Sequence, residues 1–230
     1  MADIIDPAAY RRWYETPLGA RADADEKAVV FGLADLQPGE RVLDVGCGDG
    51  NYTALAADRS GAAVGLDRST AMLDAAKRRL GARADIEWVH GDAERLPFPA
   101  GSFDVVLAVT VLCFAADRQA VVNEAARVLR RGGRLVLGEL GCYSSWAAIR
   151  RVRGLLGSAT WRHAHFFSPG ELCELARCAR LTEIRLRGAI FYPPIPNARL
   201  LSAVHAIEQV GQRGWIVGAA FLALCAVCPR

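Results

Sequence analysis

The chain has 230 residues, of which 52% are hydrophobic and 23% are charged, a composition that supports a packed core and argues against intrinsic disorder. The net charge of +3 is scattered in short runs, so we expect no nucleic-acid partner. The longest apolar run, 215–228, is shorter than the ~20 residues of a membrane span, and residues 1–14 lack the hydrophobic core of a secretion signal. We therefore expect a cytoplasmic protein without a membrane span.

From residue 41 onward, short β-rich runs alternate with helical runs. The pattern predicts five strands, over residues 41–45, 62–66, 86–89, 103–109 and 134–138. It also predicts three helices: one begins at Asn51, one follows Ser69 as its N-cap, and one spans residues 118–129. The almost wholly apolar run 103–109 is typical of a strand buried on both faces of a parallel sheet. This alternation predicts a parallel sheet with helices on both faces.

The pattern changes after residue 139. It predicts one helix over residues 144–156, a second that begins after the N-cap Ser168, and a third over residues 197–210. It also predicts strands over residues 181–186 and 215–227. The proline-rich stretch 192–196 excludes regular structure. We therefore predict a single domain with an N-terminal helical segment (1–38), a core (39–140) and a late region (141–230).

A glycine-rich loop follows the first strand in the stretch VLDVGCGDG, residues 42–50. Glycines between a strand and a helix let the backbone approach a ligand closely, at the edge where open α/β sheets bind ligands. The G-x-G-x-G spacing differs from the G-x-G-x-x-G of nicotinamide dehydrogenases. Asp67 ends the second strand, where a carboxylate can accept both hydroxyls of a ribose in charged hydrogen bonds of about 1.5–3 kcal/mol. Together these features indicate a ligand that contains adenosine.

Four stretches of the chain resemble class I S-adenosylmethionine-dependent methyltransferases, in particular the ubiquinone-biosynthesis-like branch with a methyltransferase type 11 domain. They are VLDVGCGDG, GLDRS, GDAERLPFPAGSFDVV and RVLRRGGRLVLGE, in order and at the usual separations over residues 40–140. The resemblance implies a Rossmann-like, seven-stranded, mostly parallel sheet with an antiparallel C-terminal strand. It also implies S-adenosylmethionine (SAM) as the cofactor.

The resemblance further implies residues that bind this cofactor, on the loops after the first four strands. They are Asp44, Gly46, Cys47, Gly48 and Gly50 at the methionine part, Asp67 at the ribose, Arg68, Met72, Asp92 and Ala93 at the adenine, and Thr110 and Val111 along the methionine end.

The N-terminal stretch 13–19 resembles a segment that folds over the cofactor in related methyltransferases. Tyr10, Trp13 and Tyr14 fall at helical spacing, and Tyr14 is expected to reach the cofactor. Because a methyl donor needs a site shielded from water, we expect residues 1–38 to act as a lid over a cofactor-binding core at 39–140. The alternative is an aromatic face that only packs on the sheet.

Acceptor specificity is expected in the late region, 141–230, where the resemblance is one of topology. The aromatic residues there favour a small, hydrophobic or aromatic acceptor. A general base is needed only if the acceptor must lose a proton. The candidates are His163, His165 and Tyr143, with Glu139 also on the expected site side, and simple surface positions are the alternative for the two histidines.

Two other functions stay open at this point: a SAM-binding protein without catalysis, and a methyltransferase that acts on a macromolecule or a metalloid. The metalloid hypothesis rests on Cys47, Cys113 and Cys142, which follow the first, fourth and fifth strands and would place soft thiolates at one end of the sheet. Ordinary packing of these cysteines is the alternative. We expect no resident metal, and a monomer or homodimer.

Overall fold

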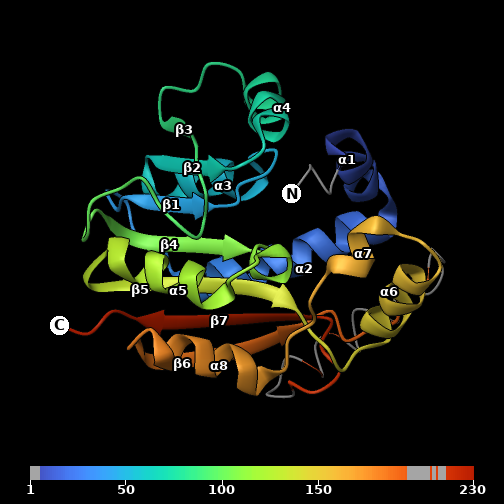
Figure 1. Ribbon diagram of the computed structural model, residues 1–230. Helices are drawn as coiled ribbons and strands as arrows, with labels where there is room; N and C mark the ends of the chain where they lie inside the picture. Colours follow the sequence, from blue (N-terminus) through green and yellow to red (C-terminus); the bar gives the residue numbers. More distant parts are fainter. Residues whose placement is uncertain (1–5, 196–207, 209–210, 212–215) are drawn as a thin grey trace.

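The computed structural model of the chain describes residues 6–195, 208, 211 and 216–230. Its centre is a seven-stranded sheet with the order β3-β2-β1-β4-β5-β7-β6 (Figure 1). The strands are β1 (Val42–Val45), β2 (Ala63–Asp67), β3 (Ile86–His90), β4 (Phe103–Val109), β5 (Leu129–Leu140), β6 (Thr182–Ala189) and β7 (Phe221–Val227). β1 to β5 pair in parallel, whereas β7 runs antiparallel between β5 and β6. The prediction of a Rossmann-like sheet with an antiparallel C-terminal strand is confirmed.

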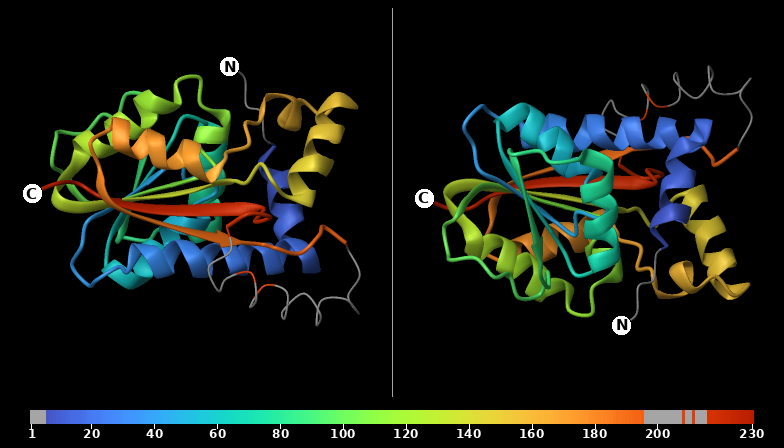
Figure 2. Two further views of the ribbon diagram at one scale, coloured as in Figure 1. Left: turned by 90° about the horizontal axis from the view of Figure 1, so that it is seen from below. Right: turned by 90° about the horizontal axis from the view of Figure 1, so that it is seen from above.

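Helices cover both faces of this sheet, as Figure 2 shows. They are α1 (Pro7–Glu15), α2 (Pro17–Ala34), α3 (Asn51–Ser60), α4 (Thr70–Leu80), the 3₁₀ helix η1 (Leu112–Phe114), α5 (Arg118–Val128), α6 (Ser145–Leu155), α7 (Ala159–His163) and α8 (Pro169–Cys178). α2 and α3 pack on one face, and α5 and α8 on the other, so the sheet separates two hydrophobic clusters.

The strand β4 shows why the sheet is buried on both sides. Its side chains alternate between the faces, as the period of two in a strand requires. Val105 and Leu107 belong to the cluster under α2 and α3, whereas Val106 and Ala108 belong to the cluster under α5 and α8. All four are fully buried. The continuous apolar run is therefore the consequence of a central position in a parallel sheet.

Helix starts follow the predicted caps. The Ser69 hydroxyl accepts from the backbone N–H of Met72 at 3.3 Å, and the Ser168 hydroxyl accepts from the N–H of Glu171 at 3.2 Å. Such a cap typically stabilises a helix by about 1 kcal/mol. Ser144 caps α6 in the same way.

Several expected boundaries differ from the structure. β5 begins at Leu129 instead of residue 134, because buried Leu129 already pairs with Phe103 across an irregularity in the register. β7 begins at Phe221 instead of 215, because Gly218 has a φ of +94° and turns the chain before the strand. The short helices η1 and α7 had not been predicted, since three to five residues carry no clear periodicity. The expected helix over 197–210 falls, but for residue 208, outside the described residues.

A tight elbow joins α1 to α2 and sets the direction of α1. The N–H of Thr16 donates to the Trp13 carbonyl at the end of α1, and the Thr16 hydroxyl accepts from the N–H of Gly19 to begin α2. A Cβ on Gly19 would overlap the Trp13 carbonyl oxygen, so the sequence W-Y-E-T-P-L-G is matched to this turn.

As a result, α1 lies with α6 and α7 beyond the carboxyl ends of the parallel strands (Figure 1). Among the helices formed by the described residues, none has the length and apolar character needed to cross a bilayer.

Candidate active site

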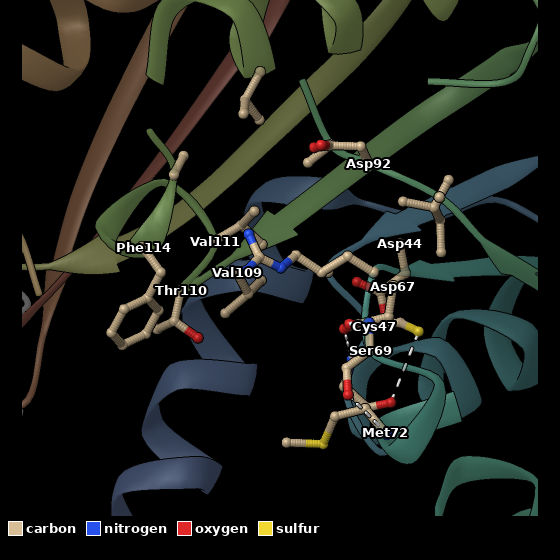
Figure 3. A pocket seen from close by; sticks show the side chains of 18 of the residues that line it. Asp44, Cys47, Asp67, Ser69, Met72, Asp92, Val109, Thr110, Val111 and Phe114 are labelled. Carbon is tan, nitrogen blue, oxygen red and sulfur yellow. Dashed lines mark hydrogen bonds between the residues drawn. The ribbon is translucent and has the colours of Figure 1, made fainter. Parts of the chain in front are cut away.

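A pocket opens at the carboxyl ends of β1, β2 and β4 (Figure 3). Every residue predicted to bind the cofactor lines it, except Tyr14 and Gly50. Figure 3 shows Asp44, Asp67 and Met72 on one side of this pocket, and Thr110 and Phe114 across from them. The loops that the sequence singled out separately are therefore brought together around one cavity.

The glycine loop forms the floor of the pocket. Gly46 and Gly48 have positive φ values of +68° and +55°, a backbone region that glycine adopts without strain. A Cβ on Gly46 would lie 2.5 Å from Cγ2 of Val111, whereas a Cβ on Gly48 would meet nothing within 4 Å. Gly50 packs instead against Trp88, which explains why it does not line the cavity. Gly48 is thus the position at which the bare backbone faces open space.

Asp67 is held at the end of β2 by backbone groups. Its Oδ2 accepts from the N–H of Gly48 at 2.8 Å, and its Oδ1 accepts from the N–H of Ser69 at 2.8 Å. A carboxylate oxygen has two lone-pair directions, so each oxygen keeps a site for one further donor. The carboxylate is therefore fixed in place and still able to accept a pair of neighbouring hydroxyls.

Asp44 is a buried acid in the same wall. The Thr53 hydroxyl donates to its Oδ2 at 2.6 Å. Burial raises the pKa of Asp44 to about 7, with the Thr53 hydrogen bond acting against this and the negative charge of Asp67 adding to it. A cation entering the pocket would favour the ionised form of this carboxyl.

Glu139 anchors the segment that follows β4. Its carboxylate accepts from the backbone N–H groups of Val111, Leu112 and Cys113 at 3.1, 2.7 and 3.3 Å. The side chain is fully buried, and burial raises its pKa to about 8 against these three donors. Glu139 therefore shapes the pocket wall through Val111, and it does not itself line the pocket.

The buried carboxyls give an expected dependence of stability on pH. Burial raises the folded-state pKa values of Glu26, Asp44 and Glu139 to about 7, 7 and 8, from ordinary values of 4.5, 3.8 and 4.5. Between about pH 4 and pH 8 the folded state then binds more protons than the unfolded state. The free energy of unfolding therefore falls as pH rises, by up to about 1.4 kcal/mol per pH unit for each group.

Thermal unfolding of the cofactor-free protein, followed by circular dichroism, should thus give a lower Tm at pH 8 than at pH 5. The Glu139→Gln variant removes one of the three groups and should show a smaller difference in Tm between these conditions. A Tm that stays level or rises from pH 5 to pH 8 would contradict the raised pKa values.

The predicted general bases do not line the pocket. His163 is exposed at the end of α7, and the Tyr143 side chain is also exposed. His165 pairs through Nε2 with Oε1 of Glu171 at 2.7 Å, and its ring packs edge-on against Phe167. The backbone N–H of His165 donates to the Cys113 carbonyl. The contacts of His165 therefore join the segment after α7 to η1 and α8.

The three cysteines of the metalloid hypothesis do not form a binding group. Cys47 lines the pocket, Cys113 is fully buried, and Cys142 is half-buried. Within the described ranges, no cluster of three or more His, Cys, Asp or Glu side chains is placed to hold a metal ion. Burial raises the pKa of the Cys47 and Cys113 thiols, which disfavours the thiolate that would bind a soft metal. The structure gives this hypothesis no support.

A polar group that the sequence had not indicated lies beside the pocket. Tyr52 of α3 lines the pocket and stacks on Phe31. Glu26 of α2 is the acidic member of this group. Burial raises its pKa to about 7, while the positive charge of Arg150 and the hydrogen bond with the Tyr52 hydroxyl act against this shift. No motif could reveal this group, because its members come from α2, α3 and α6.

Arg150 is enclosed by aromatic rings. Its guanidinium lies 5.1 Å from the ring centroid of Trp146 and 4.7 Å from that of Trp161. Burial lowers the pKa of Arg150, and the negative charge of Glu26 opposes this shift. A cation between two indole rings is held in a fixed orientation. The positive charge of Arg150 on α6 is therefore fixed near Glu26 of α2.

Helix α1 bridges the glycine loop and α6. Arg11 of α1 donates from Nη1 to Oδ2 of Asp49 in the loop at 3.0 Å. Two residues further along α1, Trp13 packs edge-on against Trp146 of α6, with ring centroids 5.9 Å apart. Tyr14 follows Trp13 on α1 and is half-buried. Helix α1 thus contacts both the glycine loop and α6.

Comparisons with known proteins identify relatives of this chain. A family model described as a methyltransferase domain matches residues 43–137. A ubiquinone biosynthesis O-methyltransferase of Idiomarina loihiensis is 31% identical over 163 residues, 67% of this chain and 67% of the relative. An uncharacterised protein of Mycobacterium tuberculosis is 32% identical over 222 residues, 96% of this chain and 72% of the relative.

Among solved structures, a SAM-dependent methyltransferase of Thermotoga maritima, described as a possible histamine N-methyltransferase, superposes with a TM-score of 0.75. It is 25% identical, and the match covers 96% of this chain and 95% of that one.

Proposed function

This chain belongs to the SAM-dependent methyltransferase family and uses SAM as its methyl donor, and from this premise we propose that it methylates a small, hydrophobic or aromatic acceptor. The observation that carries the proposal is the pocket in which the backbone of Gly48 and the carboxylates of Asp44 and Asp67 converge. Its acceptor side is aromatic, with Tyr52 and Phe114 in the wall.

We propose that the chain holds the cofactor as follows. Asp67 accepts the two ribose hydroxyls through the lone pairs left free by Gly48 and Ser69. Asp44 provides a negative charge for the ammonium of the methionine part, and Asp92, exposed at the rim, provides one for the adenine amine. The absent side chain of Gly48 leaves the space that the cofactor requires.

Bound SAM supplies a methyl group that is already activated by its sulfonium, so the chain need not supply a covalent nucleophile. The protein's task is to place the acceptor atom in line and to exclude water. Positioning of this kind can lower a barrier by about 7–11 kcal/mol. The contacts of Arg11 with Asp49 and of Trp13 with Trp146 support the proposal that residues 6–38 close over the reacting groups.

The proposed acceptor class follows from the aromatic rings that line the pocket. Tyr52 and Phe114 offer apolar ring surfaces there, which suit an aromatic acceptor. The relative from Idiomarina loihiensis is named for ubiquinone biosynthesis, which agrees with an aromatic acceptor carrying hydroxyl groups. Methylation of such a hydroxyl or ring carbon requires that a proton be removed.

We propose that Glu26 receives this proton through the Tyr52 hydroxyl. A carboxyl with a pKa of about 7 is suited to general-base work near neutral pH. Both side chains are buried, but only Tyr52 lines the pocket, so the proposed proton route to Glu26 runs through the Tyr52 hydroxyl.

The Glu26→Gln variant should lower kcat by about a hundredfold or more, while its affinity for SAM should stay within twofold of the wild type. The rise of kcat with pH through about 7 should also disappear, which a purely structural role would not produce. Glu174→Gln, on the exposed side of α8, is the matched control and should keep both the rate and the pH profile. A Glu26→Gln enzyme with the wild-type pH profile would exclude Glu26 from proton transfer.

A single-turnover assay with methyl-labelled SAM tests the acceptor class. Purified protein is incubated with a panel of phenols, hydroquinones, amines and carboxylic acids, and the label is extracted into an organic solvent. We expect the label in the phenol or hydroquinone fractions. Label found only on added RNA or protein would overturn the acceptor class. Tight SAM binding with no transfer to any acceptor would favour a binding protein without catalysis.

A further inference from the structure

Exposed apolar side chains gather on one helix beside the site. Most of the large hydrophobic side chains that are exposed in the described residues lie between 143 and 156, and the others are Ile195 and Val217. Leu155 and Leu156 are 88% and 81% exposed, and Val152 is 53% exposed. Large apolar side chains that are exposed together on one helix indicate an interaction site.

Helix α6 has two distinct faces. Its inner face is buried through Trp146, Ala147 and Gly154, and the indole N–H of Trp146 donates to the Tyr192 carbonyl at 2.7 Å. Ile149, Val152 and Leu156 follow at spacings of three and four and lie on the opposite side. The fold therefore fixes α6 by one face and leaves the other without an internal partner among the described residues.

The charge around this surface has one sign. From residue 141 to residue 170 the chain contains no Asp or Glu, and it contains four arginines. Arg151 and Arg153 flank the apolar side chains on α6, and both are exposed. An apolar stripe with arginines at its borders is the pattern of a helix that lies in the interface of a bilayer with anionic lipids.

We propose that the outer face of α6, formed by Ile149, Val152, Leu155 and Leu156 with Arg151 and Arg153, docks the protein on an anionic lipid bilayer. The apolar side chains would enter the headgroup region, and the arginines would pair with lipid phosphates. A bilayer satisfies both features at once, whereas an apolar protein surface would leave the arginines without counter-charges. The surface is a peripheral contact and does not span the bilayer.

The place of α6 connects docking with the acceptor. α6 and α7 lie beyond the carboxyl ends of the parallel strands (Figures 1 and 2). The pocket opens at the same end of the sheet, and the inner face of α6 carries the Arg150–Trp146 group. Docking through the outer face would bring the acceptor side to the lipid surface. The acceptor would then be a lipid-soluble molecule taken from the bilayer. This second step rests on the proposed function, whereas the docking does not.

Vesicle flotation of the full chain tests the docking. The probes are vesicles of phosphatidylcholine alone and of phosphatidylcholine mixed equally with phosphatidylglycerol. We expect binding to the anionic vesicles, weakened at high salt, and little binding to the neutral ones. The combined variant Val152→Ser, Leu155→Ser and Leu156→Ser should bind at least tenfold more weakly. Arg153→Gln should lose about fivefold, and Val217→Ser, an exposed apolar residue outside α6, should bind as the wild type does.

Wild-type protein that stays unbound to anionic vesicles, or a triple variant that binds as well as the wild type, would overturn the docking. So would light scattering that shows a wild-type dimer split into monomers by the triple variant, because the face would then join two copies of the chain. SAM affinity, measured on each variant, should be unchanged. A loss of lipid binding with intact SAM affinity is therefore distinguishable from a failure of the proposed function.

Discussion

Replacing Asp67 by alanine should weaken SAM binding by about tenfold to a hundredfold, as the loss of a charged hydrogen-bond acceptor predicts. The effect has two sources. The ribose hydroxyls would lose their acceptor, and the N–H groups of Gly48 and Ser69 would lose the carboxylate that aligns them. Isothermal titration calorimetry with S-adenosylhomocysteine measures the combined effect without interference from turnover.

The Asp67→Asn variant separates these two sources. An asparagine has the same shape and keeps one oxygen that accepts hydrogen bonds, so its loss of affinity should be smaller than that of alanine. Asp58→Ala, a change to an exposed acid on α3, is the control for the loss of a negative charge and should leave the affinity unchanged. Wild-type affinity in both Asp67 variants would remove this residue from the ribose role.

Gly48→Ala should reduce cofactor affinity by at least tenfold while leaving a folded protein. The new Cβ would meet no protein atom within 4 Å, so it would occupy the open space at the pocket floor. The positive φ of +55° adds a backbone cost of about 1–2 kcal/mol to folding. Calorimetry measures the affinity, and urea unfolding measures the stability.

Gly61→Ala is the matched control for this substitution. Gly61 also has a positive φ, +96°, and an added Cβ there would meet nothing within 4 Å, but Gly61 is not part of the pocket. Both variants should lose a similar amount of stability, and only Gly48→Ala should lose cofactor affinity. An unchanged affinity in Gly48→Ala would mean that the cofactor does not approach the loop at this point.

The features that could be predicted from the sequence are those set by short stretches of chain. A strand followed by glycines and a helix places its loop at the carboxyl edge of a parallel sheet, whatever the rest of the chain does. For this reason Gly46, Gly48 and Asp67 could be assigned to one pocket before the structure was known. The caps at Ser69 and Ser168 are local in the same sense.

The features that escaped prediction depend on contacts between distant segments. Glu26 and Arg150 are far apart in the sequence, and only the packing of α2 against the late region places their charges near one another. Glu139 looked like a site acid because it follows a strand, yet its carboxylate is used to hold the backbone after β4. His165 has a carboxylate partner, Glu171, that spacing alone did not suggest.

The most direct test is a crystal structure of the protein with S-adenosylhomocysteine. The ribose hydroxyls should lie within hydrogen-bond distance of the Asp67 carboxylate, and the homocysteine part should extend over Gly48 toward Asp44 and Val111. A product molecule bound away from the loop after β1, or protein that binds none of it at saturating concentration, would contradict the central claim.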